Sequence, residues 1–250
     1  MANPGNAPLR LLVSVKNRQE AVRVDSIGVD LLDIKDPLNG ALGKASNREI
    51  ENICAAVRPE TRLSAALGEL EECESFFKTA TLPERIQFAK CGLAGTAGSN
   101  WRQRLQQVWK KLHPSCRPVA VAYADACKAQ APEPLQILEC VRENGLGYLL
   151  LDTYSKLEGN LFSHLEARDV SHLITLARKS GIRVVLAGSV GIGELENIRY
   201  LGADYVGVRG AVCYNDRQGN ISGERLLHFK NAVERSDRRI ARSLTPVSQT

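Results

Sequence analysis

The stretch "VDLLDIKDPLNGALGKASNREIENICAAV", residues 29–57, joins a short apolar run, a polar loop and an amphipathic segment. The run 29–35 has the length of a strand. The segment 47–57 carries apolar residues three and four positions apart and follows Ser46, a residue type that favours helix N-caps. The stretch therefore predicts a strand, a loop and a helix, which together form the repeating unit of an α/β fold.

Apolar runs of this kind recur along the chain, with amphipathic segments such as 100–112, after Ser99, between them. Alternating strands and helices require a parallel sheet, and eight units in 250 residues favour a (β/α)8 TIM barrel over an open doubly wound sheet, the alternative. We expect one domain at 9–235, a disordered segment at 1–8 and a basic, flexible tail at 236–250. The eight predicted strands are 9–15, 29–35, 62–67, 85–92, 117–124, 147–153, 182–188 and 204–210.

The composition excludes several classes of protein. Aromatic residues make up 5% of the chain and interleave with no basic stripe, so the net charge of +5 does not predict nucleic-acid binding. No apolar run approaches the roughly 18 residues of a membrane span, and the first residues do not resemble a signal peptide. The seven cysteines are scattered, without a CxxC motif, which argues against structural zinc and disulfides. We expect a cytoplasmic protein with reduced thiols.

Two charged residues interrupt the opening run. Asp33 and Lys35 are two positions apart, so in a strand they point to the same side. They lie at the carboxyl end of the run, where TIM barrels carry their active sites. The alternative is a structural ion pair, although burial of two charges costs desolvation that their attraction often fails to recover.

Other charged residues end two further runs. Lys90 ends the run 85–92, Asp152 ends the run 147–153, and Lys156 follows four residues later. Lys90 alone is also consistent with a surface lysine, and Lys156 with a loop lysine. In a barrel, however, three lysines and two carboxylates would meet at one mouth, where repulsion and burial lower an ammonium pKa towards neutrality. Such a free amine is what Schiff-base chemistry on a carbonyl needs.

The last two strand ends carry small residues. Gly188 and Ser189 follow the seventh run, and Gly210 and Ala211 follow the eighth, which is the usual phosphate site of TIM barrels. The alternative is that the glycines only form tight turns. No GxGxxG motif follows the first strand, so a dinucleotide cofactor is not expected.

Tyr123 and Asp125 lie at the end of the fifth run. Both could position a substrate, or Asp125 could simply cap the next helix. The residues themselves do not decide between these two interpretations.

Seven segments together carry a family resemblance, which extends from about residue 9 to 230. They are "LLVS", "DIKDPLNGALGKAS", the segment from Lys90 to Gly92, "YADA", "LLDTYSKLEGNLF", "LAGSV" and "VGVRGAVC". In these motifs the chain resembles the (5-formylfuran-3-yl)methyl phosphate synthases of methanofuran biosynthesis. The two longest motifs are unusual and occur in the order that the family shows.

The resemblance implies a lyase that condenses two trioses derived from glyceraldehyde 3-phosphate into a furan aldehyde phosphate, with loss of phosphate and water. Dihydroxyacetone phosphate is a further candidate substrate. By motif, Lys35 would form the Schiff base, Lys90 would accept a proton, and Asp33, Asp152 and Lys156 would support them. Since the imine is the electrophile, we expect no metal and no cofactor.

Two other functions stay open. One is another Schiff-base aldolase or triose-phosphate barrel, and the other is a non-catalytic barrel subunit of one-carbon metabolism. Charges kept at strand ends argue against the second. Such barrels often associate through their outer helices, so we expect a homo-oligomer, with neither nucleic acid nor membrane as a partner.

Overall fold

The computed structural model describes residues 7–243, with side chains for residues 7–236, and its strands form one closed parallel barrel. Each strand pairs with the next in the sequence, and β8 pairs with β1. The predicted (β/α)8 TIM barrel is confirmed, and the open sheet is excluded. The strands are β1 (Arg10–Val15), β2 (Leu31–Ile34), β3 (Leu63–Glu69), β4 (Phe88–Gly92), β5 (Arg117–Tyr123), β6 (Tyr148–Asp152), β7 (Arg183–Leu186) and β8 (Tyr205–Val208).

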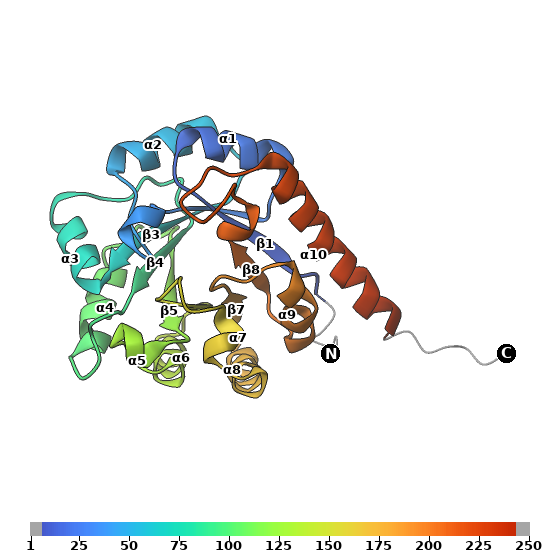
Figure 1. Ribbon diagram of the computed structural model, residues 1–250. Helices are drawn as coiled ribbons and strands as arrows, with labels where there is room; N and C mark the ends of the chain where they lie inside the picture. Colours follow the sequence, from blue (N-terminus) through green and yellow to red (C-terminus); the bar gives the residue numbers. More distant parts are fainter. Residues whose placement is uncertain (1–6, 244–250) are drawn as a thin grey trace.

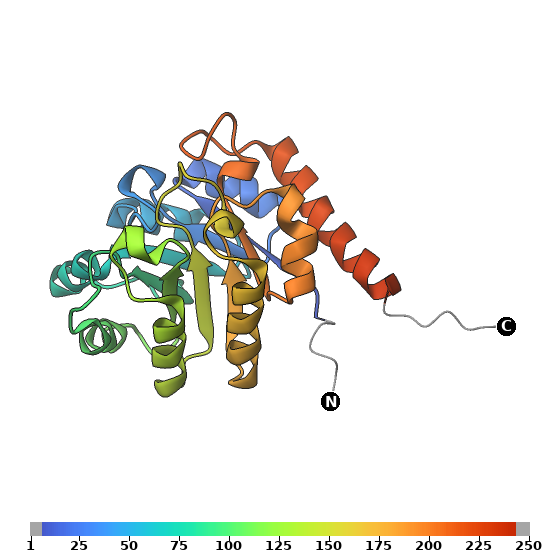
Figure 2. The same ribbon diagram turned by 60° about the horizontal axis from the view of Figure 1, so that its bottom comes forward.

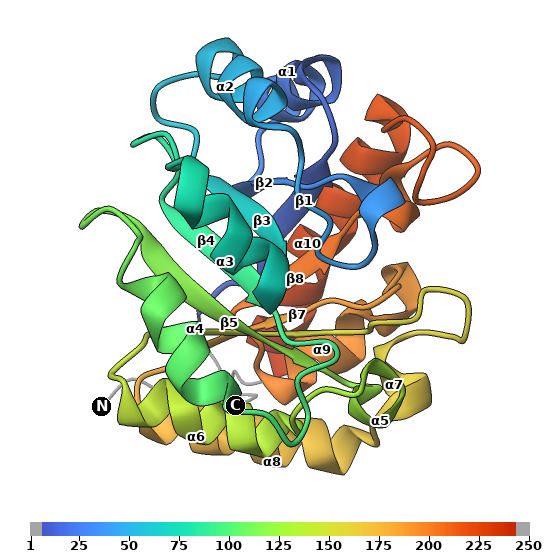
Figure 3. The ribbon, with the colours of Figure 1, turned by 90° about the vertical axis from the view of Figure 1, so that its left-hand side faces the viewer.

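Helices surround this barrel (Figure 1). Figure 2 shows α6 and α8 side by side along its outside, and Figure 3 shows α3 with α4 beside it on the side of β3 and β4. The α-helices are α1 (Arg18–Ile27), α2 (Asn47–Ala56), α3 (Leu70–Thr79), α4 (Trp101–Trp109), α5 (Ala126–Ala129), α6 (Pro134–Glu143), α7 (Leu161–His164), α8 (Ala167–Lys179), α9 (Leu195–Leu201) and α10 (Gly223–Ser243). Short 3-10 helices are η2 (Pro37–Asn39), η3 (Ile192–Glu194) and η4 (Gly210–Val212). No helix within 7–243 is long and apolar enough to cross a membrane.

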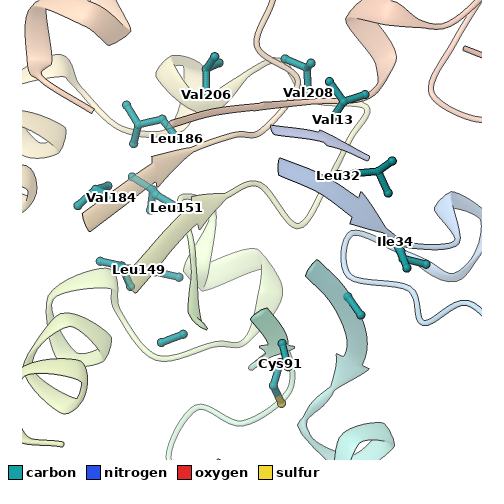
Figure 4. Close-up of a cluster of buried hydrophobic side chains, with 14 of the residues drawn as sticks. Val13, Leu32, Ile34, Cys91, Leu149, Leu151, Val184, Leu186, Val206 and Val208 are labelled. Atoms are coloured by element: carbon teal, nitrogen blue, oxygen red, sulfur yellow. The ribbon is translucent and has the colours of Figure 1, made fainter. Parts of the chain in front are cut away.

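The main hydrophobic core lies between the strands and the helices. Outward-facing residues such as Val13, Leu32 and Leu186 are fully buried there (Figure 4). Because successive strand residues face opposite sides, the residues that alternate with these along each strand point into the barrel. A second apolar cluster fills that interior and includes Leu12, Phe88, Leu150 and others. This alternation directs the charged residues of the predicted site inward.

Several predicted boundaries move by a few residues. Ser46 caps α2 as expected, its Oγ accepting a hydrogen bond from the amide of Glu49 at 3.1 Å. The helix predicted at 100–112 spans only Trp101–Trp109. The strand predicted to begin at residue 85 begins at Phe88, because a turn bonds the amide of Ile86 to the carbonyl of Pro83 at 2.9 Å.

The two predicted ends of the chain are described only in part. Residues 1–6 and 244–250 lie outside the described residues, and residues 7 and 8 are exposed and precede β1. The backbone of α10 stays helical to Ser243, past the predicted domain boundary at residue 235. Residues 236–243 contain no glycine or proline, so nothing in their sequence ends the helix.

Candidate active site

The carboxyl ends of the strands open into a cavity of about 800 Å³. All five residues predicted to be catalytic line it, as do the four small residues after β7 and β8. The cavity therefore brings together the lysines, the carboxylates and the expected phosphate loops. The nine residues are Asp33, Lys35, Lys90, Asp152, Lys156, Gly188, Ser189, Gly210 and Ala211.

Asp33 is fully buried at the base of this cavity. The strand register places it between Ser14 of β1 and Ser64 of β3. Both serine hydroxyls donate to its carboxylate, at 2.9 Å from Ser14 Oγ and 2.6 Å from Ser64 Oγ. Two neutral donors thus hold the carboxylate in one orientation inside the barrel.

Lys90 pairs with the same carboxylate, its Nζ lying 2.5 Å from Asp33 Oδ1, and both residues are buried. Burial alone would raise the pKa of Asp33. The ammonium groups of Lys90 and Lys35 and the hydroxyl of Ser64 outweigh that effect and keep this pKa below its usual value. Asp33 is therefore ionised near neutral pH.

Asp152 and Lys156 form a second pair across the mouth, with 2.6 Å between Lys156 Nζ and Asp152 Oδ1. Lys156 also donates to the carbonyl of Thr153, whose amide donates to Asp152 Oδ1 at 2.8 Å. Burial would raise the pKa of Asp152, but the charges of Lys156 and Lys35 keep it lowered. Lys90 and Lys156 thus each pair with a separate carboxylate.

Lys35 differs from the other two lysines. Its Nζ makes a long hydrogen bond of 3.5 Å to the carbonyl of Ala41, and no carboxylate oxygen of the described residues lies within 4 Å of it. The pKa of Lys35 is lowered to about 8, mainly by burial; the charges of Lys156 and Lys90 also lower it, and those of Asp152 and Asp33 oppose the shift. Part of the Lys35 population is then a free amine near neutral pH.

The turns after β7 and β8 border the same cavity. Gly188 has a φ of +96°, and a Cβ there would lie 2.8 Å from Thr153 Cγ2, so a side chain would not fit. Ser189 also has a positive φ, of 52°. At Gly210 a Cβ would lie at an ordinary 3.6 Å from Arg217 Cβ. Close packing thus requires glycine at Gly188, whereas Gly210 keeps the cavity wall open.

The structure places Tyr123 and Asp125 beside the site and not on its wall. The Tyr123 hydroxyl is buried and donates to Glu69 Oε1 at 2.6 Å. Asp125 makes no side-chain cap to α5. Its carboxylate instead accepts from the amides of Tyr154 and Ser155, at 2.6 and 2.8 Å. Asp125 therefore positions the loop that carries Lys156.

The sequence analysis missed several residues of the site, and three of them hold a predicted residue or loop in place. Ser14 and Ser64 are polar residues at inward positions of apolar strands, a pattern that would have revealed them. Arg217 lies in the loop between β8 and α10 and lines the cavity. It donates at 2.9 Å to the carbonyls of Pro37 and Gly40, in the loop after β2. Nothing local in the sequence predicts that contact between distant loops.

Comparison with known proteins supports one family. The profile of the 4-HFC-P synthase family matches residues 11–230, most of the described chain. The chain belongs to this family. Relatives named (5-formylfuran-3-yl)methyl phosphate synthase include one from Archaeoglobus fulgidus, 28% identical over 90% of this chain and 99% of its own length. Another, from Methanococcus maripaludis, is 33% identical over 81% of this chain and 89% of its own.

Solved structures share the fold of this family member at low sequence identity. Phosphoribosyl anthranilate isomerase from Thermus thermophilus superposes with a TM-score of 0.60 at 15% identity, covering 91% of this chain and 99% of its own. 3-Hexulose-6-phosphate synthase from Salmonella typhimurium gives 0.58 at 14% identity, covering 91% of this chain and all of its own. At such identities the likeness concerns the barrel alone.

Proposed function

We propose that this protein is a lyase that condenses two trioses derived from glyceraldehyde 3-phosphate into (5-formylfuran-3-yl)methyl phosphate, through an imine on Lys35. The product is the one that the names of its relatives carry, and it would serve methanofuran-type cofactor synthesis. One observation carries the mechanism. Lys35 is the cavity lysine without a carboxylate within 4 Å among the described residues, and burial lowers its pKa to about 8.

Lys35 begins the reaction as the nucleophile. Its amine adds to a triose carbonyl, a C–N bond forms, and water leaves with the carbonyl oxygen. The resulting imine withdraws electrons, so the α-carbon can lose a proton to the buried pair of Lys90 and Asp33. The enamine then attacks the aldehyde of the second triose and forms the new C–C bond.

As the ring forms, water hydrolyses the imine and frees Lys35, and the balance of atoms fixes which groups leave overall. Two triose phosphates contain two phosphates and the product contains one, so one phosphate and two waters must leave. The pair of Asp152 and Lys156 lies on the opposite side of the mouth, where it can exchange protons with departing groups. The backbone around Ser189 and Gly210, together with Arg217, borders the space left for the phosphates.

Borohydride trapping tests the imine directly. The protein is incubated with glyceraldehyde 3-phosphate and borohydride, digested, and analysed by mass spectrometry. We expect a reduced triose adduct on the peptide that contains Lys35, and no adduct in the Lys35→Arg variant. Lys44→Arg, a change at a lysine outside the cavity, is the matched control and should trap like the unchanged protein. An adduct on Lys90 or Lys156 would contradict the assignment.

A second assay tests the product. With glyceraldehyde 3-phosphate as the sole substrate, we expect release of inorganic phosphate and the ultraviolet absorption of a conjugated furan aldehyde. A Schiff-base aldolase of another kind would consume the triose without releasing phosphate. EDTA should leave the rate unchanged, because the imine supplies the electrophile. Loss of the rate with EDTA and its return with a divalent ion would contradict this mechanism.

A further inference from the structure

The opposite end of the barrel, at the amino ends of the strands, carries four arginines that the proposed reaction does not use. Each stands at the first residue of an odd-numbered strand or directly before it. Alternate strands contribute each layer of side chains inside a TIM barrel, so these residues form one layer across the lower opening. We name this layer the arginine ring. Its members are Arg10, Arg62, Arg117 and Arg183.

The arginine ring lies on two tyrosines of even-numbered strands. Arg10 and Arg62 both donate to the Tyr205 hydroxyl, at 3.3 and 3.1 Å. Arg117 and Arg183 both donate to the Tyr148 hydroxyl, at 3.2 and 3.3 Å.

Ring stacking adds to these hydrogen bonds. The guanidinium carbon of Arg10 lies 5.3 Å from the Tyr205 ring centre, and that of Arg183 lies 5.8 Å from the Tyr148 ring centre. Two pairs of guanidinium groups are therefore fixed side by side, each pair on one oxygen.

The positive charge of the arginine ring is only partly balanced by its surroundings. None of its members forms an ion pair within 4 Å in the part of the chain that the structure describes. The nearby carboxylates of Asp30 and Asp204 accept from backbone amides, of Leu11 and Val184, and act on Arg10 only through space. These two carboxylates can offset only part of the four positive charges, so the opening attracts a further anion.

Closure of the barrel does not require these charges. The layer above the arginine ring is apolar and already closes the interior, and its members are at most 7% exposed. The internal void behind that layer measures only about 20 Å³, too little for any metabolite. A ligand could therefore rest only on the outer side of the opening. The closing layer consists of Leu31, Phe88, Tyr148 and Tyr205.

The donors at this opening are in excess. A guanidinium has five N–H donors, and each member of the arginine ring uses one of them on a tyrosine oxygen. The hydroxyls of Tyr148 and Tyr205 accept two bonds each and keep their own O–H to donate. Flat guanidinium groups match the oxygens of a phosphate with paired hydrogen bonds.

We propose that the arginine ring is a second anion site, which binds inorganic phosphate or a phosphate monoester on the face of the barrel opposite the cavity. The ligand oxygens accept from the guanidinium groups and from the two tyrosine hydroxyls. Lys90 borders the same internal void as Tyr148 and Tyr205, so an anion bound below would lie directly under the base of the cavity.

Calorimetric titration of the full chain at constant ionic strength tests this site. Inorganic phosphate and glycerol 3-phosphate are used in separate titrations, which distinguish a free anion from an ester. The double variant Arg117→Gln/Arg183→Gln should lose one saturable site or bind at it at least about tenfold more weakly, about 1.4 kcal/mol. Gly210→Val should weaken a different site, the one in the cavity.

Matched variants distinguish specific binding at the arginine ring from a general effect of positive surface charge. Arg102→Gln/Arg168→Gln removes two arginines from ion pairs on outer helices and should leave the titration unchanged. Tyr148→Phe removes the hydroxyl but keeps every charge, and it should bind phosphate severalfold more weakly. This variant tests the site even if the double variant does not fold. Equal weakening by the outer control, or unchanged binding in both the arginine and tyrosine variants, would overturn the proposal.

Discussion

Both ends of the barrel carry positively charged side chains, but the charged groups and their partners differ. At the carboxyl end three lysines line the cavity together with Arg217, and two of these lysines pair with buried carboxylates at 2.5 and 2.6 Å. At the amino end the cations are arginines that lie on neutral tyrosines. An ammonium can lose its proton inside a protein, whereas a guanidinium does not. One end is therefore suited to covalent chemistry and the other to binding an anion, within one set of strands.

The largest expected effect comes from replacing the proposed nucleophilic lysine with arginine, the cation found at the amino end. Lys35→Arg keeps the positive charge but cannot form an imine, because the guanidinium stays protonated. The variant should fold and lose at least about 10³-fold in kcat. Steady-state rates and circular dichroism measure the two properties. If Lys35 contributed only its positive charge, arginine would substitute well and Lys35→Met would mainly alter stability.

The next effect concerns the buried pair of Asp33 and Lys90. Asp33→Asn keeps the shape of the side chain but leaves the Lys90 ammonium buried without a counter-charge. The free energy of unfolding should fall by about 3–5 kcal/mol, as measured by urea denaturation. Asp30→Asn, at an exposed residue directly before the same strand, is the control; its amide oxygen can still accept from Leu11, so it should cost less than about 1 kcal/mol. Equal losses of stability in the two variants would show that the buried pair contributes no more than an exposed carboxylate.

The pH dependence of activity should follow the lowered pKa of Lys35. Because only the unprotonated amine attacks, and burial lowers this pKa to about 8, kcat/KM should rise with pH and level off above about 8. Well below that pH the amine fraction falls about tenfold per unit. Initial rates across this range measure the profile. A profile that is flat between about pH 6 and 9 would show that Lys35 is not the titrating nucleophile.

A smaller effect is expected at the loops after β7 and β8, the proposed phosphate site. Gly210→Val adds a β-branched side chain on the cavity wall, where the added Cβ would lie at an ordinary 3.6 Å from Arg217 Cβ. KM for glyceraldehyde 3-phosphate should rise about tenfold, with little change in melting temperature. Gly207→Ala, inside the barrel wall, is not a suitable control because its Cβ would lie 3.2 Å from Ala187. Gly147→Ala, in open space before β6, is the better one. An unchanged KM would remove this loop from the site.

The smallest effect belongs to the amino end. Arg183→Gln removes an exposed guanidinium from a neutral hydroxyl, so the free energy of unfolding should change by less than about 1 kcal/mol. Thermal and urea unfolding measure this change. A loss of several kcal/mol would show that the arginine ring stabilises the barrel and would weaken its assignment as a binding site.

Much of the fold and part of the site followed from local sequence patterns. Asp33 and Lys35 were predicted to share a face because side chains alternate along a strand, and both line the cavity. Tyr123 shows the limit of that reasoning. It ends a strand as Asp152 does, yet its hydroxyl turns to Glu69, a partner 54 residues away.

The amino-acid sequence by itself determined the eight strand–helix units, their parallel order and the charged residues at the strand ends, because these depend on periodicity within a few residues. The tertiary structure decided which lysine pairs with which carboxylate, that Lys35 is left without one among the described residues, and that Arg217 reaches the loop after β2. It also brought four separate arginines to one opening. Such contacts depend on strand register and barrel closure, which join residues far apart in the chain.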